Sequence, residues 1–416
     1  MISLSKEIPG NSGYSVQVLI EGFACNLVSY HHVTAIFCAM NLIKACLKET
    51  QSRISKLLVP RSQLKSFVQP SLAVEEPDYY EPGGFHPISL GDTFHHDQYT
   101  ILRKLGYGQY STVWLARDLK CRRYVALKML RADCYGGTHD IFETEILSKI
   151  CEVSRQSSHE GRAHVSHLLS KFKHKGPNGE HVCLVFDVLG HHLGFQTVKY
   201  EDGRLPVKTV KLIAKQLLLG LDFLHRECGI IHTDLKPTNI LLELESPNNA
   251  IAKYLSVVPP RMADPQRGAP LREVITTPPI SEIKHPHVRI IDFGVASWRE
   301  KHLSDLIQSP ALRAPEVTIG APWDTGVDIW SLGCLIVEFI QGIVLFSRSL
   351  LRIPNLKSTS LERLLNGTSK PFLKPEDMPD HEVDIFTDFI KGMLTIDPGS
   401  RKSAAELLQH EWIHPR

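Results

Sequence analysis

Residues His232 to Asn239 read His-Thr-Asp-Leu-Lys-Pro-Thr-Asn, and the triplet Asp292-Phe-Gly294 follows much later in the chain. Each of the two segments lies next to a short apolar stretch that reads as a β-strand. A structural role alone does not account for so many polar residues in this order and at these spacings. The sequence therefore predicts a fold in which the two segments meet at one polar site.

The residue types of this site are those that phosphoryl transfer from ATP requires. Asp234 is the predicted catalytic base, and its main task is to orient the attacking hydroxyl group, because this reaction depends mostly on positioning and charge stabilisation. Lys236 is expected to neutralise the γ-phosphate. Asn239 and Asp292 are expected to bind Mg²⁺ through their oxygen atoms, which this cation prefers.

A glycine-containing turn between two predicted strands is the candidate phosphate-binding loop. Glycine allows the backbone to approach phosphate oxygens and to present N–H donors to them. Ser111 stands where such loops usually carry a third glycine, so an ordinary hairpin turn is the alternative interpretation. The residues of this segment that we expect to contact the nucleotide are Leu105, Gly106, Tyr107, Gly108, Gln109, Tyr110, Ser111 and Val113.

The next strand contains Val125-Ala-Leu-Lys128. Lys128 is predicted to reach the α- and β-phosphates while a glutamate on a helix holds it, and Ala126 is predicted to contact the nucleotide. Glu143 and Glu145 are both candidates for that glutamate. Apolar residues follow Glu143 at helical spacing, which places Glu143 at the edge of a buried stripe, so it is the favoured partner.

A third apolar strand ends at Phe186-Asp-Val-Leu189. This stretch is interpreted as the hinge between two lobes, with Phe186 at the back of the nucleotide pocket. The backbone of Asp187 and Leu189 is expected to hydrogen-bond the adenine. An ordinary strand end is the alternative interpretation.

Composition sets limits on the class of protein. The chain has 416 residues, of which 43% are hydrophobic and 22% are charged, and this is ordinary globular composition. A net charge of +2 gives no sign of general nucleic-acid binding. The nine cysteines show no zinc-binding spacing and indicate reduced thiols of the cytoplasm or nucleus.

The predicted organisation is an extension at 1–75, an edge-wrapping segment at 76–98, a small lobe at 99–189, and a large lobe at 190–416 with an inserted loop at 245–286.

The N-terminal extension admits three interpretations. Gly22 to Ile43 carries no charged side chain but holds many polar ones, which disfavours a membrane span. The excess of basic residues from Lys44 to Lys65 would suit a transit leader. A poorly ordered extension is the preferred interpretation.

Two further features are expected to support the fold. Glu316, in Ala314-Pro-Glu316, is predicted to pair with Arg401 in a buried ion pair. Asp328 is predicted to accept hydrogen bonds from the backbone N–H groups of the segment that contains Asp234.

From about Tyr79 to Arg416 the chain resembles the eukaryotic protein kinases, and more narrowly the fungal members of the SR-protein kinase family. The narrower resemblance rests on Leu105 to Leu115, on Val185 to Leu193 and on His232 to Asn239. It implies an α+β, two-lobed protein-kinase-like fold, with a small antiparallel β lobe that contains one helix and a larger, mainly helical lobe. It also implies ATP and Mg²⁺ as cofactors and transfer of phosphate to serine or threonine.

The same resemblance implies partners and a place in the cell. The expected substrates are basic, Arg/Ser-rich proteins such as splicing factors, and the expected role is regulation of mRNA processing. A monomer in cytoplasm and nucleus, with no direct nucleic-acid contact and no membrane, is predicted. An acidic run could dock such substrates, although a solvated face is the favoured interpretation of it. The run consists of Glu376, Asp377, Asp380, Glu382 and Asp384.

Two features of the chain bear on its activity, the first a part of the narrower resemblance and the second a departure from it. Thr233 occupies a position where most kinases carry an arginine that receives an activation-loop phosphate, so activity without that phosphorylation is expected. Ser347 runs almost directly into Leu350, where the family has an inserted docking region. A catalytically impaired kinase-fold scaffold is therefore the alternative function, and a membrane-anchored kinase that uses Gly22 to Ile43 is a second.

Overall fold

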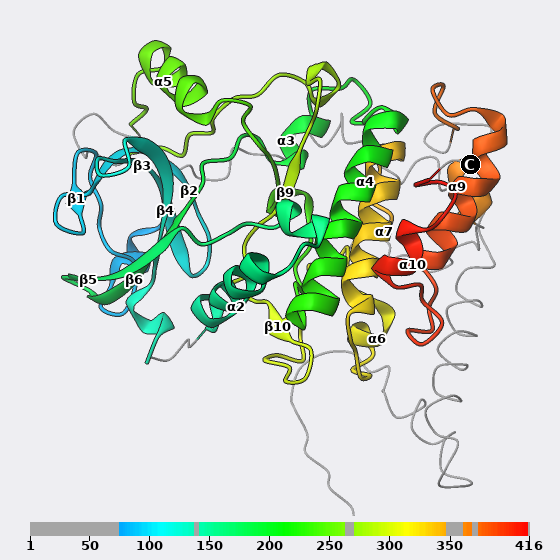
Figure 1. The fold of residues 1–416 in the computed structure, drawn as a ribbon, viewed down its shortest axis with the longest axis horizontal. Helices are drawn as coiled ribbons and strands as arrows, with labels where there is room; N and C mark the ends of the chain where they lie inside the picture. Colours follow the sequence, from blue (N-terminus) through cyan, green and yellow to red (C-terminus); the bar gives the residue numbers. More distant parts are fainter. Residues whose placement is uncertain (1–74, 137–140, 263–269, 347–360, 368–372, 415–416) are drawn as a thin grey trace, which may run out of the picture.

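The computed structural model describes residues 75–136, 141–262, 270–346, 361–367 and 373–414, and Figure 1 shows a sheet-rich part beside a mainly helical part. The first part contains a six-stranded antiparallel sheet with the strand order β1-β2-β3-β4-β6-β5. The expected two-lobed α+β fold is confirmed. The strands are β1 (Thr93–Phe94), β2 (Tyr99–Tyr107), β3 (Ser111–Asp118), β4 (Arg123–Leu130), β5 (Ser170–Gly176) and β6 (Gly179–Phe186).

Both faces of this sheet are covered, because successive side chains of a strand point to opposite sides. On one face Trp114, Val125 and Leu127 join a buried apolar cluster. On the other face Leu115 and Ala126 belong to a second cluster. The middle of β3 and of β4 is therefore an uninterrupted apolar run, Val-Trp-Leu-Ala and Val-Ala-Leu, as expected where a strand is buried on both faces.

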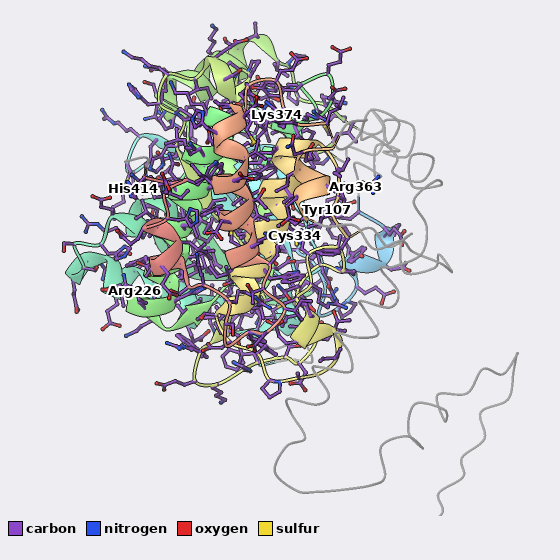
Figure 2. All side chains as sticks on the ribbon, turned by 90° about the vertical axis from the view of Figure 1, so that its right-hand side faces the viewer. Tyr107, Arg226, Cys334, Arg363, Lys374 and His414 are labelled. Carbon is purple, nitrogen blue, oxygen red and sulfur yellow. The ribbon has the colours of Figure 1, made fainter. Side chains whose placement is uncertain are left out.

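The helices of the large lobe pack around α7, which is buried at every position from Val327 to Gln341. A helix that is apolar on all sides belongs in the interior of a domain. Cys334 of this helix, labelled in Figure 2, lies among the other helices and is 1% exposed. The helices are α2 (Glu143–Gln156) beside the sheet and, in the large lobe, α3 (Leu193–Thr197), α4 (Val207–Asp222), α6 (Pro315–Thr318), α7 (Gly326–Gln341), α8 (Leu361–Leu365), α9 (Asp380–Met393) and α10 (Ala404–Leu408).

Two short antiparallel ladders bring the polar segments of the sequence together. β7 (Ile230–Ile231) pairs with β10 (Ser297–Trp298), and β8 (Ile240–Leu242) pairs with β9 (Val288–Ile290). The polar segment from His232 to Asn239 lies between β7 and β8, and Asp292 lies between β9 and β10. Pairing of the flanking strands thus places the two segments side by side.

The inserted segment at 245–286 is not the loop that the sequence suggested, because it contains helix α5 (Pro247–Val257). Pro247 stands at the first helical position, where its missing N–H costs nothing. Ile251, Tyr254 and Leu255 form a short apolar stripe at helical spacing, and they pack against the small lobe. The expectation of irregular structure was wrong because this stripe is short and is flanked by prolines and polar residues.

The predicted extension at 1–75 lies outside the described residues except for Glu75, as does the short stretch after Ser347. The edge-wrapping segment at 76–98 begins with a 3-10 helix (Pro77–Tyr80). Phe85 of this segment is buried and stacks on Tyr79 with a ring distance of 5.3 Å. Within the described ranges no helix combines the length and the hydropathy needed to cross a membrane.

Candidate active site

Lys128 on β4 joins the two parts of the site. Its Nζ atom lies 2.6 Å from Glu143 Oε1 of α2 and 2.9 Å from Asp292 Oδ1. Glu143 is 1% exposed, whereas Glu145 points to solvent. The structure therefore places Glu143, and not Glu145, beside the lysine. This arrangement follows from register, because α2 packs Ile146 and Ile150 into the core and so turns Glu143 inward.

Lys128 and the two carboxylates favour one another's charged forms, whereas Asp292 and Glu143 repel each other. Burial opposes a positive charge on Lys128, but Asp292 and Glu143 more than offset it, so the pKa of Lys128 is raised. The nearby Lys128 ammonium lowers the pKa of Asp292 to about 2. Burial raises the pKa of Glu143, although the lysine acts in the opposite direction. Asp292 is therefore an anion at neutral pH, as cation binding requires.

Asp234 lies at the centre of a hydrogen-bonded group. Lys236 Nζ contacts its Oδ2 atom at 2.5 Å, and Ser309 Oγ donates to its Oδ1 atom at 3.0 Å. The Asn239 amide nitrogen donates to the Asp234 backbone carbonyl at 3.0 Å. A carboxylate held in this way can accept a hydrogen bond from a hydroxyl group, as it does here from Ser309.

Asn239 and Asp292 provide suitable oxygen ligands for Mg²⁺. The backbone N–H of Ile291 donates to the carbonyl of Asn239 at 2.9 Å, so the two residues lie on adjacent chain segments. The amide nitrogen of Asn239 is held by Asp234, which leaves its amide oxygen as the atom for a cation. The side chain of Asp292 is 46% exposed. One carboxylate and one amide, with water and phosphate oxygens, is a ligand set that this hard cation accepts. In the described ranges no group of three or more His, Cys, Asp or Glu side chains could hold a metal ion.

The predicted glycine loop is the turn between β2 and β3. Gly106 pairs with Val113 and Tyr107 with Thr112, and the N–H of Gly108 donates to the Ser111 carbonyl at 2.9 Å. Gly108 and Gln109 are exposed at the tip, Tyr110 is half-buried, and Ser111 is buried. Ser111 fits where a glycine was expected because it lies within β3, and a strand places no special demand on its backbone.

Apolar residues predicted to contact the base lie near one another. Leu105, Val113, Ala126 and Phe186 belong to one cluster, and Ala126 pairs directly with Phe186 in the sheet. Asp187 follows Phe186, and its carboxylate pairs with Arg289 of β9 at 3.2 Å. Leu189 is half-buried. This stretch follows the apolar cluster directly, and hydrogen bonding of its backbone to an adenine stays a prediction.

The loop that carries Asp234 is fixed by Asp328 of α7. The backbone N–H of His232 donates to Asp328 Oδ2 at 2.8 Å, and that of Thr233 donates to Oδ1 at 2.9 Å. His225 contacts the same carboxylate at 2.9 Å. The predicted role of Asp328 is confirmed.

Thr233 has a φ of 65°, a strained value for a β-branched residue. Its hydroxyl donates to the Val295 carbonyl at 2.7 Å, which ties this loop to the segment after Asp292.

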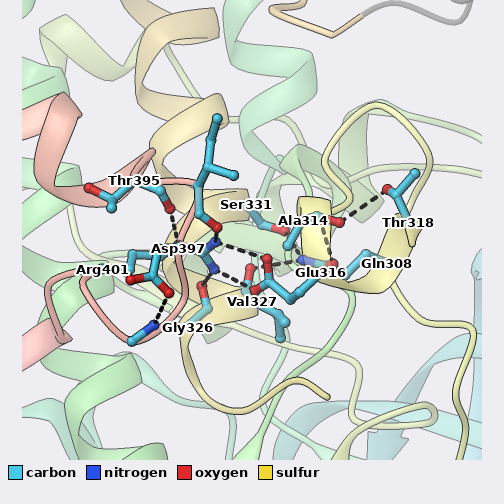
Figure 3. A network of polar contacts seen from close by, with 12 residues as sticks. Gln308, Ala314, Glu316, Thr318, Gly326, Val327, Ser331, Thr395, Asp397 and Arg401 are labelled. Atoms are coloured by element: carbon cyan, nitrogen blue, oxygen red, sulfur yellow. Dashed lines mark hydrogen bonds and ion pairs between the residues drawn. The ribbon is translucent and has the colours of Figure 1, made fainter. Parts of the chain in front are cut away.

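Gln308, which sequence reasoning missed, fixes the segment from Val295 to Arg313. It is 8% exposed, and its Nε2 atom donates to the Val327 carbonyl and to Ser331 Oγ, each at 2.8 Å. Its Oε1 atom accepts from the N–H of Ala314 at 2.9 Å. Figure 3 shows these bonds in one network. Val327 and Ser331 lie 19 and 23 residues away from Gln308, so local sequence patterns give no signal of this role.

Arg401 and Glu316 form the predicted buried pair, also drawn in Figure 3. Arg401 Nη1 lies 2.6 Å from Glu316 Oε1, and Nη2 lies 2.9 Å from Oε2. Their side chains are 0% and 3% exposed. A bidentate contact between planar groups fixes both distance and orientation. The pair therefore holds the chain in place just after the segment from Val295 to Arg313.

Intramolecular contacts take up much of the acidic run. Asp377 accepts a hydrogen bond from the N–H of Val207 at 2.7 Å. Glu382 pairs with Lys211 at 2.5 Å, and Asp380 pairs with Lys374, labelled in Figure 2, at 3.1 Å. Glu376 and Asp384 remain exposed. These contacts favour a structural role for most of the run.

Comparison with known proteins identifies the family. The model of the protein kinase domain matches residues 99–413. Protein kinase dsk1 of Schizosaccharomyces pombe is 34% identical over 360 residues, which cover 65% of this chain and 66% of that protein. Serine/threonine-protein kinase SRPK of Physarum polycephalum is 33% identical over 388 residues, 80% of this chain and 90% of that protein.

SRSF protein kinase 3 of Homo sapiens is 38% identical over 248 residues, which cover 58% of this chain and 43% of that protein. The match thus spans less than two thirds of both dsk1 and the human relative, but most of the Physarum protein. The region that the family model matches contains His232–Asn239, Asp292–Gly294 and strands β2 to β6. The chain belongs to the protein kinase family, as an SR-protein-kinase-like member of its serine/threonine kinases.

Proposed function

We propose that this chain transfers the γ-phosphoryl group of ATP to serines of basic, Arg/Ser-rich proteins and so acts in the regulation of mRNA processing. The main support for the proposal is that Lys128, Asp292 and Asp234, with the side chains bound to Asp234, lie together at the boundary of the two lobes. Three charged groups that distant parts of the sequence supply are held there within hydrogen-bonding distance of their partners.

The residues divide the work as follows. Lys128, held by Glu143, presents a fixed positive charge to the phosphates that lie under the glycine loop. Asn239 and Asp292 would hold Mg²⁺, which neutralises the charge of the transferred phosphoryl group when it is bound. Asp234 orients the serine hydroxyl group toward phosphorus and accepts its proton, and Lys236 stabilises the charge beside it.

The choice of substrate is supported by the relatives and by charge. The human relative is named an SRSF protein kinase. Exposed acidic residues such as Glu376 and Asp384 would attract an arginine-rich chain at long range and raise its rate of association. A monomer of the cytoplasm and nucleus, without direct nucleic-acid or membrane contact, belongs to the same proposal.

We further infer that activity does not require phosphorylation of the segment from Val295 to Arg313. Thr233 cannot form the ion pair with phosphate that an arginine would form. Its hydroxyl instead bonds to the Val295 carbonyl, and Gln308 binds the other end of the segment to α7. Neutral hydrogen bonds thus order this segment, in place of an ion pair between an arginine and a phosphate. Loss of activity when the recombinant chain is treated with phosphatase would contradict this inference.

The substrate proposal is tested with two synthetic peptides. One carries alternating arginine and serine, and in the matched peptide lysine replaces every arginine. Phosphate incorporation from ATP should be much faster with the arginine peptide, because guanidinium groups bind carboxylates in a bidentate manner and ammonium groups do not. Equal rates with both peptides would refute Arg/Ser recognition, and no incorporation into either would refute the proposed substrate class.

A further inference from the structure

The insertion between β8 and β9 reaches the strand that leads into the glycine loop. Glu273 of the insertion donates its backbone N–H to the Lys104 carbonyl of β2 at 2.8 Å, and Arg272 forms a parallel bridge with Lys104. Lys104 stands two residues before Gly106 in the sequence. Leu271–Thr277, here called the strap, therefore lies along the edge of the strand that positions the phosphate-binding turn.

Glu273 connects the strap to several other segments. Its side chain is buried, and its Oε2 atom lies 3.3 Å from Arg103 Nε of β2. The Tyr254 hydroxyl of α5 donates to the same oxygen at 2.8 Å, and the N–H of Arg261 donates to Oε1 at 3.0 Å. One carboxylate thus joins β2, α5 and the segment after α5.

Arg103 completes the connection from the other side. It is 9% exposed, and its Nη2 atom donates to the Val258 carbonyl at the end of α5, at 3.1 Å. A buried guanidinium needs a carboxylate to balance its charge, and Glu273 supplies it. The position of β2 relative to the insertion consequently depends on Glu273.

The far end of the strap is attached to the hinge and the large lobe. Ile275 is 2% exposed and packs in the same cluster as Ala126 and Val188. The N–H of Thr277 donates to His191 at 3.2 Å, and Gln196 of α3 donates to the Thr277 hydroxyl at 2.8 Å. Gly190 allows this close approach, since a Cβ atom there would lie 2.4 Å from Thr277. The strap therefore connects β2, the hinge and α3.

We propose that Glu273 is a positioning residue for nucleotide binding, because it fixes strand β2, and with it the glycine loop, to an insertion that is itself attached to the hinge. The residue does not touch the nucleotide and acts through β2. The proposal rests on the proposed function, in which the glycine loop holds the phosphates of ATP. Neither the glycine motif nor the hinge motif signals this role in the sequence.

The test measures nucleotide binding directly, with fluorescent mant-ADP and Mg²⁺ on the full chain. Glu273→Ala should raise the dissociation constant about tenfold or more, because a buried charge loses its partner and β2 loses its tie. Tyr254→Phe removes only one hydroxyl group and should raise the constant by up to about fivefold, the worth of one hydrogen bond. Glu273→Gln keeps the shape of the side chain and should lie between wild type and Glu273→Ala.

A matched control and a second readout separate positioning from general damage. Glu180→Gln breaks the Lys173–Glu180 pair between β5 and β6, and it should leave mant-ADP binding unchanged. In peptide phosphorylation, the Glu273 variants should raise the KM for ATP and leave the KM for the peptide unchanged. A structural role alone would move both KM values together.

The outcomes are distinct. If folded Glu273→Gln and Tyr254→Phe variants bind mant-ADP as tightly as wild type, the role of Glu273 is refuted and the proposed function stands. If the wild-type chain binds no mant-ADP, both the proposed function and the role of Glu273 are refuted. If wild type binds mant-ADP but phosphorylates no Arg/Ser peptide, only the substrate proposal fails.

Discussion

Replacement of Gln308 by alanine tests whether buried hydrogen bonds, rather than a phosphate, keep the segment from Val295 to Arg313 in order. The side chain makes two bonds of 2.8 Å and one of 2.9 Å, to Val327, Ser331 and Ala314. At roughly 1 kcal/mol each, their loss destabilises the ordered segment by about 3 kcal/mol. Water can hydrogen-bond to some of the groups that lose Gln308 as their partner, which reduces this loss. We therefore expect kcat/KM for an Arg/Ser peptide to fall about 10- to 100-fold.

Backbone strain is separated from hydrogen bonding by a second variant. Gln308 has a φ of 66°, which glycine adopts more easily than alanine does. Gln308→Gly should therefore be no less active than Gln308→Ala, and both should lie far below wild type. Gln409→Ala, at an exposed position, serves as the matched control. The assay is steady-state peptide phosphorylation with a circular-dichroism check of folding. A wild-type kcat/KM in folded Gln308→Ala would show that these hydrogen bonds do not keep the segment in order.

Three further outcomes are expected. Lys128→Met should lower phosphate transfer by at least about 100-fold and, because Glu143 loses the partner of its buried charge, lower the unfolding free energy in urea by about 3 kcal/mol. Glu316→Gln should cost about 3 kcal/mol in the same urea titration, since Arg401 keeps a buried charge without a counterion; a loss below about 1 kcal/mol would show that the pair adds little. Burial lowers the pKa of His86 from 6.5 to about 4. The unfolded chain therefore takes up a proton between pH 6.5 and 4 that the folded chain does not, stability falls with pH across this window, and His86→Gln should flatten the fall.

Several features of the fold and the site could be predicted from the sequence, because short sequence patterns signal them. The motifs gave the resemblance to protein kinases, and that resemblance implied the two-lobed fold. The apolar spacing after Glu143 favoured it over Glu145 as the residue beside Lys128, and the structure places it there. The pairing of Glu316 with Arg401 was also expected. The residues after Glu143 share one helical face, where local spacing carries the information, whereas Glu316 and Arg401 lie 85 residues apart and each belongs to its own short motif.

The remaining features depend on partners far apart in the chain. Gln308 sits in an unremarkable stretch, and its role appears only when Val327 and Ser331 of α7 are brought to it. Helix α5 offers a stripe of only a few apolar residues among prolines, so its packing on the small lobe decides its structure. Glu273 likewise reads as one charge in a polar insertion. Tertiary contacts fix these elements, and local propensity gives no sign of them.

The most direct test of the central claim compares the wild-type chain with Asp234→Ala in transfer of labelled γ-phosphate from ATP to an Arg/Ser peptide. Wild type should phosphorylate serine, and Asp234→Ala should lose at least about 100-fold in rate, because the carboxylate that orients the hydroxyl group is gone. Equal incorporation by both proteins would contradict the assignment of Asp234 and, with it, the proposed site.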